Sequence, residues 1–352
     1  MNKLLFLIKR PKVVVIMGGA RQCCKEAVFR VLEPHFKIGK EVLIYEEDSQ
    51  NQGNLEFLIK KSSLPVLVVT HVGEYHPDRE FFAGDLQKVE AARKLARLLS
   101  SQGYLVLNFD DETVRDLANE SIAHPLTFGF GARSAVKANH VVLTQFPSLG
   151  TNFKVNYEGN IVPVWLEKLF GKEHIYSALA AAAVGEVLGL NLVEVSAALK
   201  SYRGLPGKMQ LKKGIKNSWV LDDSESASSL SMAEALSVLK KIETPGRKMA
   251  VLGDIIGIGK YTVEAHEALG ERVAESCDFL FTVGSRARFI AQGAVKSGMS
   301  EDKIFRFDET GRAGLFLQEK IQPDDLILVD GSKEMSMINI VKEVVALSSS
   351  PV

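Results

Sequence analysis

Hydrophobic residues in the first half of the chain form short solid runs separated by amphipathic patterns. Residues 85–101 place leucines and a valine near helical spacing, with basic residues between them. The apolar runs have the length of strands and lie at 13–16, 42–45, 66–70 and 104–108. Buried strands that alternate with helices predict a parallel sheet with crossover helices.

The pattern changes and then restarts in the second half. Residues 125–170 alternate in the way typical of antiparallel strands, and two helical segments follow, the first of them rich in alanine. The stretch RGLPGK at 203–208 contains two glycines and a proline and predicts a domain boundary. Beyond it, strands are expected at 219–221, 249–252, 279–283, 304–307 and 326–329, with helices between them. We therefore predict an α/β protein with a parallel-sheet domain over 1–204 and a doubly wound domain over 205–352.

Length and composition narrow the class of protein. A chain of 352 residues favours two domains, and 43 basic residues balance 43 acidic ones. This balance argues against a nucleic-acid partner. Three cysteines without metal-ligand spacing fit a reducing cytoplasm. The apolar run Leu4 to Ile8 is too short for a transmembrane segment; we expect it to pack on the domain, with association at a membrane surface as the alternative.

The stretch VIMGGARQCC, residues 15–24, begins as a phosphate-binding loop begins, with a strand, glycines and then a helix. Gly18 and Gly19 would let backbone N–H groups approach phosphates. Arg21, however, stands where a lysine is usual, and Gln22 stands where a serine or threonine would bind magnesium. The residues leave two interpretations open, a working phosphate loop or a structural strand-to-helix turn.

Polar side chains follow three further strands, at the edge where open α/β sheets bind ligands. A histidine beside a strand-end carboxylate could bind a divalent cation, and an Asn or Asp there could hold a base or ribose hydroxyls. Solvated loops and turn chemistry explain the same residues. They are Glu46, Glu47, Asp48, His71, His76, Asn108, Asp110 and Asp111.

Several longer segments, in this order, resemble the Mur ligase family over nearly the whole chain. They include LVLNFDDE and GKEHIYSALAAAAVGEVLGL in the first half, then LPGKMQL, WVLDDSESASSLSM, GRKMAVLGDIIGIG and DDLILVDGSKEMSM. The resemblance is nearest to the branch that adds D-alanyl-D-alanine to a UDP-muramoyl tripeptide. It implies a P-loop-type central ATP-binding domain over 1–204 and a Rossmann-like C-terminal domain over 205–352. It also implies that the family's N-terminal UDP-sugar domain is missing from this sequence.

The resemblance implies a reaction linked to peptidoglycan precursor synthesis. ATP phosphorylates a carboxylate, and an amine attacks the acyl phosphate to give an amide, ADP and phosphate, with Mg²⁺ as cofactor. By position, Glu46 and His76 match magnesium ligands, while Lys208 and Asp223 lie where the C-terminal domain closes on ATP and the amine. The nucleotide would meet the remaining matched residues, Gly18, Gly19, Arg21, Gln22, Asn108 and Asp111.

The sequence also departs from the family's pattern at positions that handle charge. Arg21 and Gln22 replace the loop lysine and threonine, Ala92 replaces a carbamoylated lysine, and Asp330 replaces a late lysine. Two hypotheses follow. The chain is a cytoplasmic ATP-dependent carboxylate–amine ligase, or it is an inactive Mur-ligase-like protein that binds or regulates a protein partner.

Overall fold

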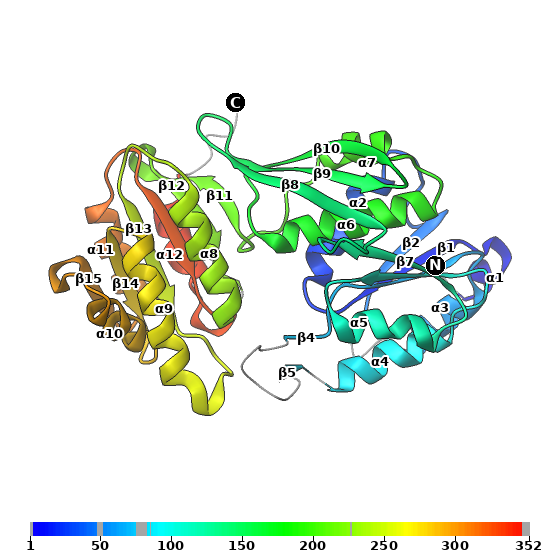
Figure 1. Cartoon of the computed structure of the whole chain (residues 1–352), viewed down its shortest axis with the longest axis horizontal. Coiled ribbons are helices and arrows are strands. Elements are labelled where there is room, and N and C mark those ends of the chain that lie inside the picture. Colours follow the sequence, from blue (N-terminus) through cyan, green and yellow to red (C-terminus); the bar gives the residue numbers. More distant parts are fainter. Residues whose placement is uncertain (1–2, 48–51, 75–82, 85, 226, 347–352) are drawn as a thin grey trace. The chain divides into compact units, whose positions relative to one another are not determined.

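The computed structural model describes residues 3–47, 52–74, 83–84, 86–225 and 227–346. The chain divides into two compact units (Figure 1). The first comprises Met1–Val142, Asn152–Leu166 and Lys172–Gly204. The second comprises Leu143–Thr151, Glu167–Gly171 and Leu205–Val352, so two short segments from the first half of the chain belong to it.

Eight strands of the described chain form the main sheet of the first unit, in the order β10-β9-β8-β7-β6-β3-β1-β2. The strands from β2 to β7 in this order pair in parallel, and the apolar residues of β1 and β3 are buried. Burial on both faces explains why these strands are solid apolar runs. The bounds are β1 Lys12–Met17, β2 Val42–Glu46, β3 Pro65–Val69, β6 Tyr104–Asn108, β7 His124–Gly129, β8 Val136–Thr144, β9 Gly150–Tyr157 and β10 Asn160–Glu167.

One expectation for this region is wrong in part. The alternation over 125–170 predicted antiparallel strands, but β7 pairs in parallel with β6 and with the start of β8. The physical reason is that helix α5 (Glu112–Asp116) and a 3₁₀ turn (Leu117–Glu120) connect β6 to β7, which is enough chain for a crossover. Farther on, Glu158 and Gly159 both have positive φ and join β9 to β10 in a two-residue hairpin.

Helices cover this sheet. Helix α6 is buried on all sides because it packs against α2, α7 and strands β6 and β7, which explains its run of alanines. The short strands β4 (Gly73–Glu74) and β5 (Ala83–Gly84) pair with each other. The remaining helices are α1 Lys3–Lys9, α2 Arg21–Leu32, α3 Gln52–Lys61, α4 Leu86–Arg97, α6 Lys172–Val187 and α7 Leu192–Leu199.

The N-terminal apolar run forms α1, and one of its residues, Phe6, is buried against the domain. Phe6 is buried beside Phe57, whereas Leu4, Leu5, Leu7 and Ile8 are exposed. The expectation that this run packs on the domain is therefore correct for Phe6 alone. Among the described residues, no helix has the length and apolar character needed to cross a membrane.

The second unit is the predicted doubly wound α/β arrangement. Its described strands run in the order β11-β12-β16-β13-β14-β15, parallel except for β11, a short edge strand that the sequence pattern did not predict. The strands are β11 Gln210–Lys213, β12 Trp219–Asp223, β13 Lys248–Gly253, β14 Phe279–Val283, β15 Ile304–Phe307 and β16 Leu326–Asp330. The helices are α8 Ser229–Lys241, α9 Thr262–Ser276, α10 Arg288–Lys296, α11 Thr310–Lys320 and α12 Ile338–Val344, with 3₁₀ turns at Ile215–Asn217, Gly259–Tyr261, Glu301–Lys303 and Lys333–Met335.

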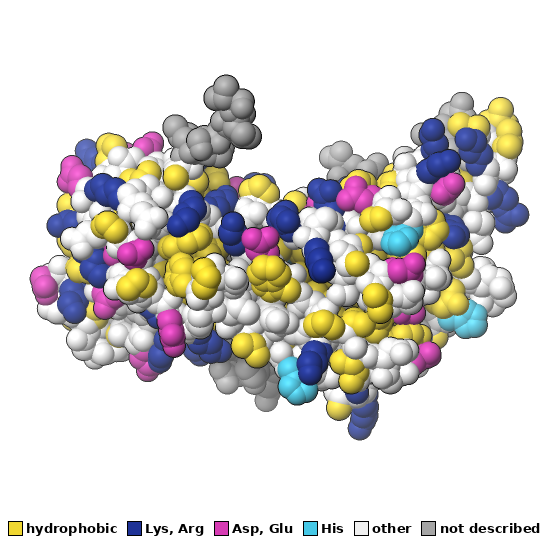
Figure 2. All heavy atoms as spheres, turned by 90° about the horizontal axis from the view of Figure 1, so that it is seen from above, with side chains coloured by type: hydrophobic (Ala, Val, Ile, Leu, Met, Phe, Trp, Pro, Cys, Tyr) yellow, Lys and Arg dark blue, Asp and Glu magenta, His cyan; other side chains and the backbone are white. Residues whose placement is uncertain are grey.

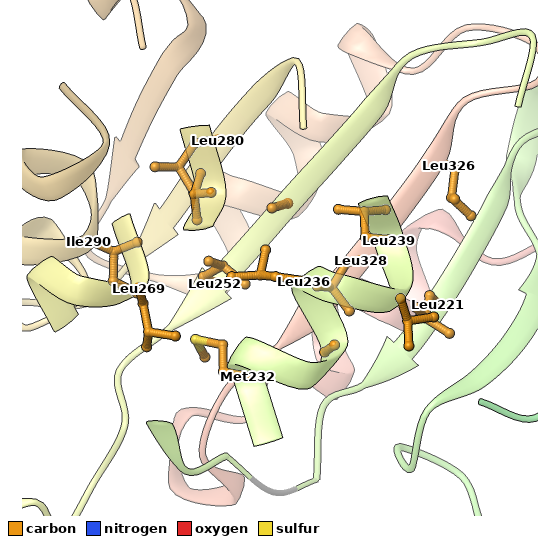
Figure 3. Close-up of a cluster of buried hydrophobic side chains, with 14 of the residues drawn as sticks. Leu221, Met232, Leu236, Leu239, Leu252, Leu269, Leu280, Ile290, Leu326 and Leu328 are labelled. Atoms are coloured by element: carbon orange, nitrogen blue, oxygen red, sulfur yellow. The ribbon is translucent and has the colours of Figure 1, made fainter. Parts of the chain in front are cut away.

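Side chains of successive residues in each strand point to opposite faces of this second sheet. Leu252 and Leu328 join Leu236 of α8 in one core, drawn in Figure 3. Val251 and Val329 belong to the other core, beneath α11 and α12. The two-residue period of a strand thus divides the apolar side chains between two helical layers, which is why helices cover both faces.

Leu236 tests this packing. We expect Leu236→Ala to lower the free energy of unfolding by about 2 to 5 kcal/mol, because the side chain is fully buried between α8 and the sheet. Leu230→Ala, on the same helix but 68% exposed, should change it by less than about 0.5 kcal/mol. Urea denaturation of both variants measures the difference. Equal losses would contradict the assignment of the core.

Candidate functional site

The turn after β1 is tied to the end of β3 by backbone hydrogen bonds. Thr70 N–H donates to the Met17 carbonyl at 3.1 Å, and Gly19 N–H donates to the His71 carbonyl at 2.7 Å. Gly18 has φ +100°, and a Cβ there would lie 2.6 Å from Thr70 Oγ1 and would overlap the His71 carbonyl. Only glycine fits this position, because of both its backbone conformation and the close approach of β3.

The side chain of His71 packs directly on Gly19. A Cβ at Gly19 would overlap the Cε1 and Nε2 atoms of the imidazole ring. The ring therefore covers one side of the turn and limits how closely a phosphate approaches Gly19. His71 follows β3, as the sequence predicted, and in the structure it closes the turn.

Helix α2 begins at this turn with an unsatisfied positive end. Ala20, in the left-handed conformation with φ 54°, precedes the helix and supplies no side-chain acceptor to its first turn, which also lacks an acidic residue. Arg21 Nε is buried and has no hydrogen-bond partner among the described residues. Uncapped N–H groups and the helix dipole favour an anion at this position. Gln22 is exposed.

Glu46, at the end of β2, is paired with a cation of the same unit. Its Oε1 lies 3.1 Å from Lys25 Nζ on α2, and its buried Oε2 has no hydrogen-bond partner in the described part of the chain. His76, the second magnesium ligand expected from the resemblance, lies outside the described residues. Those residues contain no group of three or more His, Cys, Asp or Glu that could hold a metal ion. The turn therefore fits a phosphate, and a magnesium ion held by Glu46 and His76 stays a prediction.

Asn108 and Asp111, expected at the nucleotide, are engaged in the loop after β6. Asn108 Oδ1 accepts from the Asp110 amide at 3.0 Å. Asp111 caps α5 by accepting from Val114 N–H at 3.0 Å, and its other oxygen accepts from Val72 N–H at 3.1 Å. These bonds favour the turn-chemistry interpretation of both residues.

Asp110 has a larger role than the sequence suggested. It accepts hydrogen bonds from the Phe130 amide at 2.6 Å, the Gly131 amide at 2.9 Å and the Tyr176 hydroxyl at 3.0 Å. It thereby joins the loop after β6 to the loop after β7. The signal for this link lay in the glycines of GFGAR, since a Cβ at Gly129 would lie 2.6 Å from Asp110 Oδ2.

A cavity of about 650 Å³ opens beside these two loops. It is lined by Phe109, Arg115, Ala132 and Arg133, and the Arg115 guanidinium lies 5.1 Å from the centre of the Phe109 ring. An aromatic ring and guanidinium groups suit a stacked base and nearby phosphate oxygens. Only β3 separates β6 from β1, so the ends of these strands are about 10 Å apart. Sequence reasoning missed this cavity because its residues come from two separate loops.

In the second unit, two aspartates at the end of β12 hold the segment that contains Lys208. Buried Asp222 accepts from Lys212 Nζ at 2.5 Å and from the Gly207 amide at 3.1 Å. Asp223 accepts from the Met209 amide at 3.2 Å. The residues on both sides of Lys208 are thus fixed to the carboxyl end of β12.

Asp330, at the end of β16, pairs in register with Asp223. It is fully buried, and neither carboxylate oxygen has a hydrogen-bond partner within the described residues. Burial, and then the negative charge of Asp223, raise the pKa of Asp330 well above its usual range, although the Gly331 backbone and Lys208 act in the opposite direction. The Asp330 carboxyl group therefore keeps its proton to a higher pH than an exposed aspartate does.

The adjacent cysteines on α2 are not placed for reactivity. Cys23 and Cys24 are both buried, and burial raises the pKa of the Cys24 thiol to about 12. A thiol that does not ionise is a poor nucleophile. These residues fill space between α2 and its neighbours.

Comparison with known proteins identifies the fold's relatives. Residues 30–185 match the model of the Mur ligase middle domain, and residues 207–333 match that of the Mur ligase glutamate ligase domain. The chain belongs to the Mur ligase family. It is 25% identical over 310 residues to UDP-N-acetylmuramoyl-tripeptide–D-alanyl-D-alanine ligase of Bacillus subtilis, covering 87% of this chain and 64% of that enzyme.

Two solved Mur ligase structures share the fold. MurF from Acinetobacter baumannii superimposes with a TM-score of 0.79 at 21% identity, over 96% of this chain and 77% of that one. MurF from Thermotoga maritima, solved in complex with ADP, superimposes with a TM-score of 0.72 at 19% sequence identity. The superposition covers 95% of this chain and 79% of that one. The present chain spans about two thirds of the length of the Bacillus subtilis enzyme.

The site residues predicted for this Mur ligase family chain fall into two groups, one in each unit. In the first unit, the turn before α2 brings Gly18, Gly19 and Arg21 together. Lys25 of α2 forms an ion pair with Glu46. In the second unit, Lys208 and Asp223 lie at one strand end with Asp330. The contacts of His71, Lys25 and Asp110 join residues far apart in sequence, so no local pattern revealed them.

The packing of His71 on Gly19 predicts a coupled pair of substitutions. Gly19→Ala should lower the free energy of unfolding by about 1 to 3 kcal/mol, because the added methyl group overlaps the imidazole. In a His71→Ala background the same change should cost less than about 1 kcal/mol. A double-mutant cycle in urea measures the coupling. Gly53→Ala, where a Cβ meets nothing within 4 Å, is the control, and additive costs would refute the contact.

The burial of Asp330 predicts that this residue lowers the free energy of unfolding in a pH-dependent way. Well below pH 3.8, the ordinary pKa of this carboxyl group, the folded and unfolded chains both carry the proton. As pH rises, the unfolded chain releases it while the folded chain retains it, so the wild type loses stability until pH exceeds the raised pKa. The free energy of unfolding of Asp330→Asn relative to wild type should therefore increase by at least about 1 kcal/mol from pH 4 to pH 8.

Urea denaturation across this pH range tests the Asp330 prediction. The exposed Asp308→Asn in the same unit is the matched control and should follow the wild type throughout. A difference between Asp330→Asn and wild type that stays constant with pH would show that Asp330 is ionised in the folded protein.

Proposed function

We propose that this chain is an ATP-dependent carboxylate–amine ligase of the Mur type that acts on peptidoglycan precursors in the cytoplasm. The observation that carries the proposal is the start of α2, where uncapped N–H groups and the unpaired Nε of Arg21 meet at the carboxyl end of a parallel sheet. Membership of the Mur ligase family supports the reaction class, and the ADP complex of Thermotoga maritima MurF supports a nucleotide as ligand.

The reaction proceeds in two steps. The γ-phosphoryl group of ATP passes to a substrate carboxylate, giving an acyl phosphate and ADP. The lone pair of an amine then attacks the acyl carbon, phosphate leaves with the bonding electrons, and the amine loses a proton to form the amide. In both steps the protein mainly positions the groups and balances negative charge.

We assign the phosphate-binding charge to residues of α2. Arg21 and the first amides of the helix would bind the phosphates, and Lys25 one turn later would add a second cation. Glu46 holds Lys25 at 3.1 Å and so sets its position. Glu46 and His76 would together hold a magnesium ion, which would balance the negative charge of the phosphates.

We further propose that residues 1–204 form the nucleotide-binding domain and residues 205–352 the domain that brings the amine substrate. Phe109 and the guanidinium groups of the neighbouring cavity would hold the base, with Asn108 and Asp111 shaping the loop. Lys208, fixed by the bonds of its neighbours to Asp222 and Asp223, is the cation offered by the second domain.

A second candidate is a family member without catalysis that binds a protein partner. Two observations favour it. Lys25 pairs with one oxygen of the Glu46 carboxylate, and the His71 ring covers Gly19. Both contacts reduce the space and the free charge that the turn offers to a nucleotide and its metal.

Calorimetric titration with ATP tests the proposed site. We expect Arg21→Ala to weaken ATP binding about 10- to 100-fold, because it removes a charged hydrogen-bond donor from the phosphates. Arg30→Ala, at the other end of α2 and paired with Glu26 and Glu33, is the matched control and should bind as the wild type does. No detectable binding at millimolar ATP would overturn the proposal.

Titrations with and without magnesium separate the roles of Glu46. If Glu46 only positions Lys25, Glu46→Ala should weaken ATP binding equally under both conditions. A loss confined to the magnesium-containing titration would show that Glu46 binds the metal. Phosphate release with UDP-muramoyl tripeptide and D-alanyl-D-alanine then distinguishes the candidates, since ATP binding without turnover supports the inactive protein.

A further inference from the structure

Helix α1 exposes its apolar side chains. Leu4 and Ile8 are 69% and 72% exposed, and Leu5 and Leu7 are 40% and 44% exposed. Phe6 alone is buried, at 2%. Single exposed leucines are ordinary, but four large aliphatic side chains together on one short helix are not.

The exposed side chains form one continuous face. With about 100° between successive residues of a helix, Leu4 and Ile8 lie on the same side, and Leu5 and Leu7 flank them. Phe6 points the opposite way and packs on Phe57, with 5.6 Å between the ring centres. The Lys3 ammonium also lies over the Phe57 ring, 5.4 Å from its centre, so the helix is held to the unit on the Phe6 side while its apolar face points outward.

Basic side chains border this face. Lys3 is the first residue of the helix and Lys9 is the last. Lys9 also lines a surface cavity of about 630 Å³. The charged residues lining the cavity are Lys9, Arg10, Lys12, Lys37, Lys40 and Glu41. Figure 2 shows yellow hydrophobic side chains beside dark blue Lys and Arg side chains at the upper right, in the part of the first unit where Figure 1 labels α1.

The charge of this surface is local. The whole chain has no formal net charge, yet the cavity carries five cations and one carboxylate. That carboxylate, Glu41, accepts a hydrogen bond from the Lys37 amide at 2.9 Å and so serves the backbone. The apolar face of α1, bordered by lysines, complements a surface that has an apolar interior and anionic groups at its edge.

We propose that α1 and the basic cavity beside it dock on the surface of an anionic lipid bilayer. The face of Leu4, Leu5, Leu7 and Ile8 lies among the upper acyl chains, and the cavity's cations meet lipid phosphates. A helix this short binds weakly through its apolar area alone, so both parts are required and the association is reversible. This inference is independent of ATP binding and of ligase activity.

Co-sedimentation of the full chain with vesicles tests the proposal. One set of vesicles is phosphatidylcholine alone, and the other contains about one third phosphatidylglycerol. We expect binding to the anionic vesicles only, reduced by high salt. The double variant Leu4→Glu with Ile8→Glu should lower the partition coefficient at least about tenfold. Lys37→Ala and Lys40→Ala should each lower it about fivefold.

Matched controls come from exposed positions elsewhere in the same unit. Ile122→Glu and Lys154→Ala should bind as the wild type does. Because the changed side chains of α1 are exposed, all variants should unfold at the wild-type temperature, which separates lost binding from lost folding.

Three results would overturn the proposal. They are no sedimentation of the wild type with anionic vesicles, equal binding to both vesicle types, and wild-type binding by the α1 double variant. Light scattering, which measures the oligomeric state, tests whether a second copy of the chain covers this face instead. A wild-type dimer that the double variant dissociates, without vesicle binding by either protein, would assign the face to a second copy of the chain.

Discussion

Two backbone hydrogen bonds between the end of β1 and the end of β3 determine where the candidate nucleotide site lies. They join Thr70 to Met17 and Gly19 to His71, and they hold the turn so close to β3 that position 18 accommodates only glycine. The turn in turn sets where α2 begins and therefore where its unsatisfied N–H groups and Arg21 lie. If these bonds were broken, the helix end would lose its place at the edge of the sheet.

The two units build their strand-end sites by different means. In the first, a helix end supplies positive charge, and Lys25 pairs the same helix with Glu46. In the second, carboxylates fix the backbone, because Asp222 and Asp223 accept hydrogen bonds from the amides on both sides of Lys208. Asp330 stands apart as a buried group without hydrogen-bond partners in the described chain. Burial and the neighbouring charge of Asp223 raise the pKa of this carboxyl group.

The sequence predicted most of the fold because both main sheets bury their parallel strands on two faces. The runs at 104–108, 279–283 and 304–307 match β6, β14 and β15 to the residue. Prediction was less accurate where burial does not set the pattern. The edge strand β11 was not predicted, β7 pairs in parallel against its alternation, and α1 turns its apolar face outward.

The candidate site was predictable only in outline. Sequence pattern placed Gly18, Arg21 and Glu46 at strand ends, because those positions follow from the strands themselves. It did not reveal that His71 covers Gly19, that Lys25 pairs with Glu46, or that Asp110 joins two loops. Each of these contacts depends on which strands become neighbours in the folded chain, and that information is not local.

Amide NMR during titration with ADP shows whether the first turn of α2 is an anion site. The largest chemical-shift changes should fall on the amides of residues 20–22 and on the Nε–Hε signal of Arg21. Unchanged signals there, with shifts confined to other surfaces such as the basic cavity, would contradict this expectation.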